Sequence, residues 1–206
     1  MTKIKLCGIK TIQDIKIINE YMPEYIGFIF APKSKRYITK QTAIHLKNAL
    51  NEKISAVGVF VNEDAETVAQ LLNDNVIDIA QLHGDETEEY IKNLRNITQK
   101  PVIKAFKIEN AQDIQKAQQS TADFVILDSG KGGTGKVFDW LVIKDLDRPY
   151  FLAGGLNTDN IKTALVSLSP YAVDVSSGIE TDGSKDADKV AEFVKIVRKH
   201  ERKHEK

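Results

Sequence analysis

The stretch ISAVGVFVNEDAETVAQLLNDNVIDIAQL, residues 54–82, contains the unit from which the fold can be inferred. It begins with an apolar run at 54–61 that is rich in valine and is typical of a buried strand. Residues 64–75 begin with an aspartate, a common capping residue, and predict a helix, and a second apolar run follows at 77–82. Two strands joined by a helix form a βαβ unit, in which the strands run parallel.

The same unit repeats along the whole chain. Predicted strands occupy 3–7, 25–30, 54–61, 77–82, 102–106, 123–128, 150–154 and 172–176. Predicted helices occupy 11–22, about 39–50, 64–75, 85–97, 110–119, 138–144, 157–168 and 186–202. Eight strands that alternate with helices over roughly 200 residues predict a (β/α)8 TIM barrel. An open, doubly wound α/β sheet is the alternative, because it is built from the same units.

The composition is that of one globular domain. Of 206 residues, 42% are hydrophobic and 28% are charged, which suits a domain with a sizeable core. We expect a single domain over residues 1–206, in which the charged segment 198–206 extends the last helix into solvent. Lysine and arginine together number 29, as do aspartate and glutamate, so the overall charge indicates neither a nucleic acid nor an anionic membrane as partner.

Cysteine usage and hydropathy point to a reducing compartment. The chain has one cysteine, Cys7, and therefore no internal disulfide. No secretory leader pattern is visible at its start, and no apolar stretch approaches the roughly 20 residues that cross a bilayer. We therefore expect a cytoplasmic protein without membrane contact.

In a barrel of this kind the active site lies in the loops that follow the strands. The predicted seventh and eighth strands are followed by AGGLN (153–157) and SSGIE (176–180), whose turns would present free backbone N–H groups. Loops at these two positions commonly hold a phosphate group. The alternative is that the glycines only shape tight turns.

Barrel closure would place two reactive side chains beside this phosphate site. The first strand ends at Cys7 and the sixth at Asp128, and these strands would flank the eighth and the seventh. A thiol and a carboxylate that face each other across a sugar phosphate are a candidate general base and general acid. Lys5 shares a strand face with Cys7, so its charge would lower the thiol pKa, unless a buried acid such as Asp174 neutralises it.

At these residues the chain resembles the phosphoribosylanthranilate isomerase family. The resemblance extends along the whole chain rather than resting on one motif. It is carried by KLCGI (5–9), GFIFAPKSKRYI (27–38), VGVFVN (57–62), QLHGDE (81–86), LDS (127–129), GGTGKVFDW (132–140), LAGGLN (152–157) and VDVSSGIE (173–180).

The resemblance implies a (β/α)8 barrel that uses no cofactor and no metal. It implies that the chain isomerises N-(5-phosphoribosyl)anthranilate to the ribulose phosphate by an Amadori rearrangement, with Cys7 as the base and Asp128 as the acid. Arg36 would hold the anthranilate carboxylate, across the barrel mouth from the phosphate turns. The residues that match the phosphate-binding turns are Gly154, Gly155, Ser176, Ser177 and Gly178.

Three further polar residues are candidates for contact with substrate. Asp174 lies two residues before Ser176 and therefore points to the same face of the strand. It would either accept a hydrogen bond from a sugar hydroxyl or pair with a core lysine. Gln81 and His83 share a face that points toward the site, although His83 is equally well read as a structural histidine. The expected partner is a small phosphosugar substrate, and the expected assembly is a monomer or a homodimer.

Two motifs are misleading, and two other classes of function stay open. GKGGTGKV (130–137) has Val137 where a phosphate-binding P-loop needs serine or threonine, so we read it as a loop that closes over the substrate. HERKH (200–204) matches a zinc-protease motif, but the segment around it is charged throughout. Two rival functions stay open. One is another sugar-phosphate barrel enzyme, such as indole-3-glycerol phosphate synthase, in which Lys104 would be the catalytic lysine. The other is a sensor that binds a sugar phosphate and catalyses no reaction.

Overall fold

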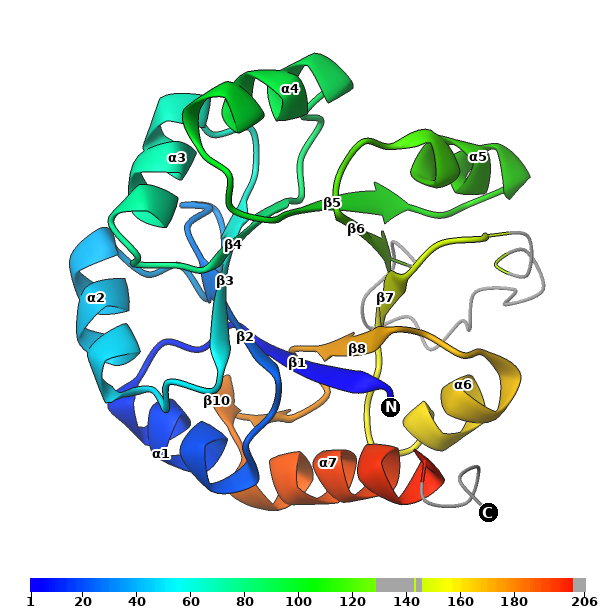
Figure 1. The fold of residues 1–206 in the computed structure, drawn as a ribbon. Coiled ribbons are helices and arrows are strands. Elements are labelled where there is room, and N and C mark those ends of the chain that lie inside the picture. The colour runs from blue at the N-terminus through cyan, green and yellow to red at the C-terminus, as the bar shows by residue number, and fades with distance from the viewer. Residues whose placement is uncertain (129–142, 144–145, 202–206) are drawn as a thin grey trace.

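The chain forms a closed barrel of eight parallel strands in the computed structural model, which describes residues 1–128, 143 and 146–201 (Figure 1). Strand β1 pairs with β8 as well as with β2, which confirms the predicted barrel and rules out an open sheet. The strands are β1 (Lys3–Cys7), β2 (Tyr25–Ile29), β3 (Ser55–Phe60), β4 (Ile79–Leu82), β5 (Val102–Lys107), β6 (Phe124–Asp128), β7 (Tyr150–Ala153) and β8 (Ala172–Val175).

Helices surround the ring of strands on the outside (Figure 1). None of the helices in the described part of the chain is long and apolar enough to cross a membrane. The helices are α1 (Ile12–Tyr21), α2 (Lys40–Ala49), α3 (Ala65–Asn73), α4 (Glu88–Ile97), α5 (Ala111–Gln119), α6 (Ile161–Ser167) and α7 (Ala187–Glu201).

Several predictions concern segments that lie outside the described residues. The predicted helix at 138–144 is one of them, apart from residue 143, and the predicted closing loop at 130–137 is another. Of the charged tail, residues 198–201 continue α7 as expected, and residues 202–206 are not described.

Polar side chains at the helix starts explain where several helices begin. Thr11 accepts a hydrogen bond from the backbone N–H of Asp14, whose carboxylate accepts one from the Thr11 N–H in return. Asn110 and Asp113 form the same reciprocal pair at the start of α5. Such a box satisfies N–H groups that have no partner within the helix, and it fixes the point at which the chain turns from loop into helix.

Side-chain alternation along the strands separates an outer core from the barrel interior. Ile4 and Leu6 of β1 are fully buried in the layer between strands and helices. Lys5 points the other way and pairs with Asp174 of β8, and Cys7 reaches the pocket above it, as the alternation predicts. The face of β1 that carries the chemistry is therefore the inward one.

Aromatic rings fill the end of the barrel at which the strands begin. Phe151 lies 5.5 Å from the Tyr25 ring, 5.8 Å from Phe124 and 5.7 Å from Tyr171, measured between ring centroids. The ammonium group of Lys3 covers this layer, with its Nζ 2.7 Å from the hydroxyl of Tyr171. Rings packed in this way close the barrel below the site.

A short antiparallel hairpin between β8 and α7 was not predicted. It consists of β9 (Glu180–Thr181) and β10 (Ser184–Lys185), joined by Asp182 and Gly183. Both connecting residues have positive φ, 52° and 76°, as a two-residue hairpin turn requires. Asp-Gly is the residue pair that favours this turn, so the signal was present in the sequence.

We predict that Phe151→Ala lowers the free energy of unfolding by about 3–5 kcal/mol, because it leaves a cavity among the packed rings. Urea unfolding followed by circular dichroism measures the loss. Val166→Ala is the control, because Val166 is 70% exposed on α6, and we expect a change within about 0.5 kcal/mol. Equal losses in the two variants would contradict the importance of this aromatic layer.

Candidate active site

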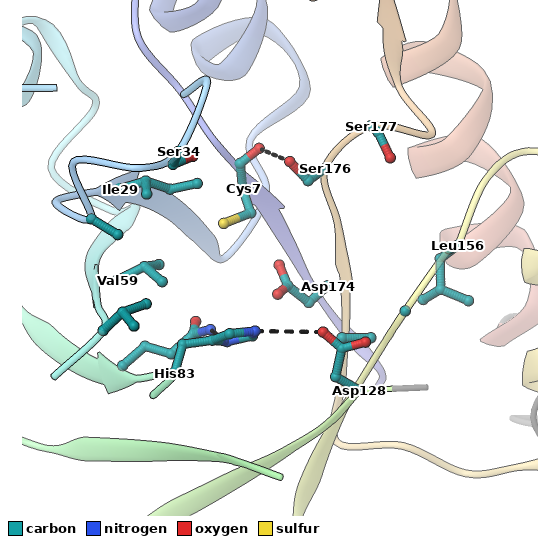
Figure 2. Close-up of a pocket in the computed structure, with 16 residues that line it drawn as sticks. Cys7, Ile29, Ser34, Val59, His83, Asp128, Leu156, Asp174, Ser176 and Ser177 are labelled. Carbon is teal, nitrogen blue, oxygen red and sulfur yellow. Dashed lines mark hydrogen bonds and ion pairs between the residues drawn. The ribbon is translucent and has the colours of Figure 1, made fainter. Parts of the chain in front are cut away.

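A pocket of about 380 Å³ opens where the strands end. Most of the predicted site residues line this pocket, together with Leu156 and several apolar side chains at the ends of β2 and β3. The predicted residues that line it are Cys7, Gln81, His83, Asp128, Gly154, Gly155, Asp174, Ser176 and Ser177. Figure 2 shows the sulfur of Cys7 and the carboxylate of Asp128 directed into the same hollow. Of the predicted site residues, only Arg36 and Gly178 are absent from its lining.

Cys7 lies deep in this pocket, between charged groups. Its exposed fraction is 6%, and burial raises the pKa of its thiol. The ammonium groups of Lys5 and Lys185 oppose that rise, and the carboxylate of Asp174 adds to it. Lys5 acts on the Cys7 pKa in the expected direction, but the net pKa is raised, because the cost of burying a thiolate outweighs the attraction of the lysines.

Asp174 pairs with a core lysine, Lys5, which is one of the two alternatives that the sequence left open. The Lys5 Nζ lies 2.9 Å from Asp174 Oδ1, and the lysine side chain is fully buried. Asp174 also lines the pocket, so the pairing with a core lysine does not remove it from reach of a ligand.

Gln81, His83 and Asp128 form a connected row at the end of β4 and β6. The side-chain amide nitrogen of Gln81 lies 2.8 Å from His83 Nδ1, and His83 Nε2 lies 3.5 Å from Asp128 Oδ2 (Figure 2). An amide N–H that donates to Nδ1 leaves the ring proton on Nε2, facing the carboxylate. His83 thus lies beside Asp128 in addition to lining the pocket.

The loops after β7 and β8 lie side by side and present their turns to the pocket. Gly154 and Gly155 have φ values of 93° and 66°, which other residues rarely adopt. A Cβ on Gly178 would lie 2.0 Å from the carbonyl oxygen of Leu156, so glycine is required there for the two loops to approach. The Ser176 hydroxyl donates to the carbonyl oxygen of Cys7 at 3.1 Å and ties this loop to β1 (Figure 2).

Arg36 is placed differently from the expectation that it lies across the barrel mouth from the phosphate turns. Its Nε and Nη2 donate to the two carboxylate oxygens of Glu180 at 2.7 and 2.6 Å, and Glu180 follows the turn after β8. Arg36 therefore lies beside this turn, over β1. A Cβ on Gly8 would lie 2.4 Å from the Arg36 Cδ, so the glycine after Cys7 makes room for the arginine stem.

Sequence reasoning missed two parts of the site. One is an apolar wall at the ends of β2 and β3, formed by Ile29, Ala31, Val59 and Val61. Its signal was the apolar run that continues to the end of each strand. The other is the buried pair of Glu180 and Lys185 on the hairpin, whose charges no periodic pattern assigns to the interior.

Lys104 does not reach the pocket, which counts against the indole-3-glycerol phosphate synthase reading. Its Nζ bonds to Glu86 at 3.0 Å and to the carbonyl oxygen of Gly84 at 2.7 Å. Within residues 1–128, 143 and 146–201, no three His, Cys, Asp or Glu side chains converge as ligands of a metal ion.

Fold and pocket together define a (β/α)8 barrel enzyme with a thiol and a carboxylate beside glycine- and serine-rich turns. The family model for N-(5'-phosphoribosyl)anthranilate isomerase matches residues 4–196. The isomerase of this name from Endomicrobium trichonymphae is 45% identical over 202 residues, which cover 96% of this chain and 99% of the relative. The chain therefore belongs to the phosphoribosylanthranilate isomerase family.

Solved structures of the family superpose over nearly the whole barrel. The isomerase from Thermotoga maritima has a TM-score of 0.89 at 36% identity, covering 97% of this chain and 100% of the other. A family structure in complex with reduced 1-(o-carboxyphenylamino)-1-deoxyribulose 5-phosphate has a TM-score of 0.86 at 34% identity, with the same coverage.

The ion pairs that Glu180 forms with Arg36 and Lys185 predict a pH dependence of stability. Burial opposes the charge of Glu180, but hydrogen bonds from Arg36 and Lys185 outweigh it and lower its pKa from 4.5 to about 2. Between these values the unfolded chain binds a proton that the folded chain does not, so the contribution of Glu180 is fully present above about pH 4.5 and is lost as the pH falls toward 2.

We therefore predict that wild type exceeds Glu180→Gln in free energy of unfolding by a margin that is constant near neutral pH and narrows as the pH falls below about 4.5. Urea unfolding from about pH 3 to pH 7 measures this margin. A margin that stays the same over this whole range would show that the Glu180 charge does not stabilise the fold.

Proposed function

We propose that the pocket converts N-(5'-phosphoribosyl)anthranilate into 1-(2-carboxyphenylamino)-1-deoxyribulose 5-phosphate, a step of tryptophan biosynthesis. The observation that supports this most directly is the placement of Cys7 and Asp128 on the walls of one pocket, next to turns suited to a phosphate. The reaction is an Amadori rearrangement, which needs one acid, one base and no cofactor.

The phosphate is held by the turns after β7 and β8. Gly154, Gly155, Ser176 and Ser177 line this part of the pocket, and Gly178 keeps the two turns close together. Backbone N–H groups of such turns bind phosphate oxygens without needing a lysine. The phosphate thereby fixes the sugar between Cys7 on β1 and Asp128 on β6.

Asp128 acts first, as the general acid. It gives a proton to the ring oxygen of the ribose while the amine nitrogen supplies an electron pair to C1, so the C1–O bond breaks and an iminium forms. The row from Gln81 through His83 holds the carboxyl group in place.

Cys7 acts second, as the general base. The iminium acidifies the hydrogen on C2, and the Cys7 thiolate removes it to give an enolamine. Loss of the enol O–H proton and protonation of C1 then give the aminoketone, so the reaction is neutral in protons overall. Lys5 and Lys185 favour the thiolate that this step needs, against the cost of burial.

The anthranilate end of the substrate fits the remaining wall. Ile29, Val59 and Val61 offer an apolar surface for the aromatic ring. The carboxylate is assigned to Arg36, because a guanidinium matches a planar carboxylate with two parallel hydrogen bonds.

The proposed substrate is a small phosphosugar. We place the protein in the cytoplasm. The assembly is a monomer or a homodimer. The isomerase from Thermotoga maritima is described as dimeric, which supports the second possibility for this chain.

We predict that purified protein removes the fluorescence of phosphoribosylanthranilate with EDTA present, and that Cys7→Ser and Asp128→Asn each lower kcat at least about 100-fold, because each removes one proton-transfer group. The substrate is formed in situ from anthranilate and phosphoribosyl pyrophosphate.

Asp123→Asn is the matched control, because Asp123 directly precedes β6 at the opposite end of the strand from Asp128 and contacts Arg95. Its kcat should stay within about twofold of wild type. A folded wild type without turnover would instead favour a sugar-phosphate sensor, and turnover by both site variants would contradict their roles.

We further predict that Lys5→Met raises the pKa of Cys7 above its value in wild type, because it removes a positive charge that favours the thiolate. Asp174→Asn should lower it by the converse reasoning. The pH dependence of alkylation by iodoacetamide measures the pKa, and Cys7 is the one cysteine of the chain. Lys104→Met is the control for a buried lysine outside the pocket, and an unchanged pKa in Lys5→Met would refute the role of Lys5.

A further inference from the structure

Three charged side chains form a cluster beside the turn after β8. Arg36 comes from the loop after β2, and Glu180 and Lys185 come from the two strands of the hairpin. Lys185 donates to Glu180 Oε1 at 2.7 Å and to the carbonyl oxygen of Ser176 at 3.0 Å. The side chains of Lys185 and Glu180 are 2% and 8% exposed, whereas that of Arg36 is 27% exposed, so the arginine is the most accessible of the three.

Within the residues that the structure describes, side-chain hydrogen bonds of Arg36 occupy one edge of its guanidinium. Glu180 takes the edge formed by Nε and Nη2. A guanidinium carries five N–H donors, and the edge formed by Nη1 and the second N–H of Nη2 offers another parallel pair. Arg36 can therefore bind Glu180 and the substrate carboxylate at the same time.

Charge balance in the cluster favours that second carboxylate. Arg36 and Lys185 carry two positive charges, and Glu180 carries one negative charge. Without Lys185, Glu180 would neutralise Arg36 and repel an incoming anion. With Lys185, these three side chains carry a formal charge of one positive unit in total, which suits one carboxylate.

From this arrangement, and resting on the proposed role of Arg36, we infer that Glu180 is a positioning residue that fixes the guanidinium for recognition of the substrate carboxylate, with Lys185 as its counter-charge. The side chain of Arg36 has many rotamers, and a free arginine would lose that freedom on binding substrate. Glu180 removes this cost in advance, because both of its oxygens already hold the guanidinium.

A pair of substrates isolates this role. Condensation of ribose 5-phosphate with anthranilate gives the natural substrate, and condensation with aniline gives an analogue that lacks only the carboxylate. The ratio of kcat/KM between the two, followed by chromatography of the products, measures recognition of the carboxylate alone. Effects of a variant on folding or on Cys7 act on both substrates and cancel in the ratio.

We expect Arg36→Met to lower this ratio by about 10- to 100-fold and Glu180→Gln to lower it by about tenfold, as expected for loss or loosening of a charge-assisted hydrogen bond. In Glu180→Gln the side-chain NH2 group faces the N–H donors of Arg36 or Lys185, so the two parallel hydrogen bonds to Arg36 are not both kept. The loss should lie in KM rather than kcat, because the carboxylate is bound in the ground state and the transition state alike. Glu180→Asp keeps the charge, is shorter by one methylene group, and should also lower the ratio.

The matched control is Glu24→Gln at the other end of the barrel. Glu24 likewise pairs with an arginine, Arg198, and accepts a hydrogen bond from the Ile4 N–H. Its loss should cost stability and leave the ratio within about twofold of wild type.

The outcomes separate this inference from the proposed role on which it rests. A ratio that falls in Arg36→Met and stays at the wild-type value in both Glu180 variants overturns the positioning role and leaves Arg36 as the carboxylate ligand. A ratio unchanged in Arg36→Met overturns the assignment of Arg36 and the inference with it. Equal losses for both substrates in the Glu180 variants would assign Glu180 to folding or to Cys7, and would also overturn the inference.

Discussion

Parallel pairing between β1 and β8 closes the barrel, and the buried ion pair of Lys5 and Asp174 lies across that seam. The two residues are register partners, so their side chains meet only when the strands are aligned as observed. A slip by one residue would turn Lys5 and Cys7 toward the outer core and bring Leu6 inside. Because an unpaired buried charge is costly, the ion pair favours the register that places Cys7 in the pocket.

The closure also explains why so much of the site could be predicted from the sequence. Cys7, Asp128 and the two glycine-rich turns lie far apart in the chain, but each directly follows or ends a strand. Once eight strands are assigned and the ring is closed, their order around the mouth is fixed by topology alone. Strand boundaries were predicted to within a residue or two, which is enough for this purpose because the alternation of side chains sets which of them point inward.

What the sequence did not reveal depends on contacts between distant segments and on the balance of opposing energies. Arg36 and Glu180 are 144 residues apart, and no local pattern indicates that they meet. The net pKa shift of Cys7 depends on how far burial outweighs two lysines, and this requires the packed structure. The hairpin at 180–185 is a different case, because its Asp-Gly turn is a local signal that the alternation of strands and helices obscured.

The aromatic layer of Phe124, Phe151 and Tyr171 forms a floor of the barrel, and these rings contact one another rather than the loops around the pocket. These rings stabilise the end of the barrel that lies opposite the pocket. Over evolutionary time, loops at the pocket end can change length and composition while the floor keeps the ring closed. New substrates are accessible to such a scaffold without a new fold, because none of the rings in this aromatic layer lines the pocket.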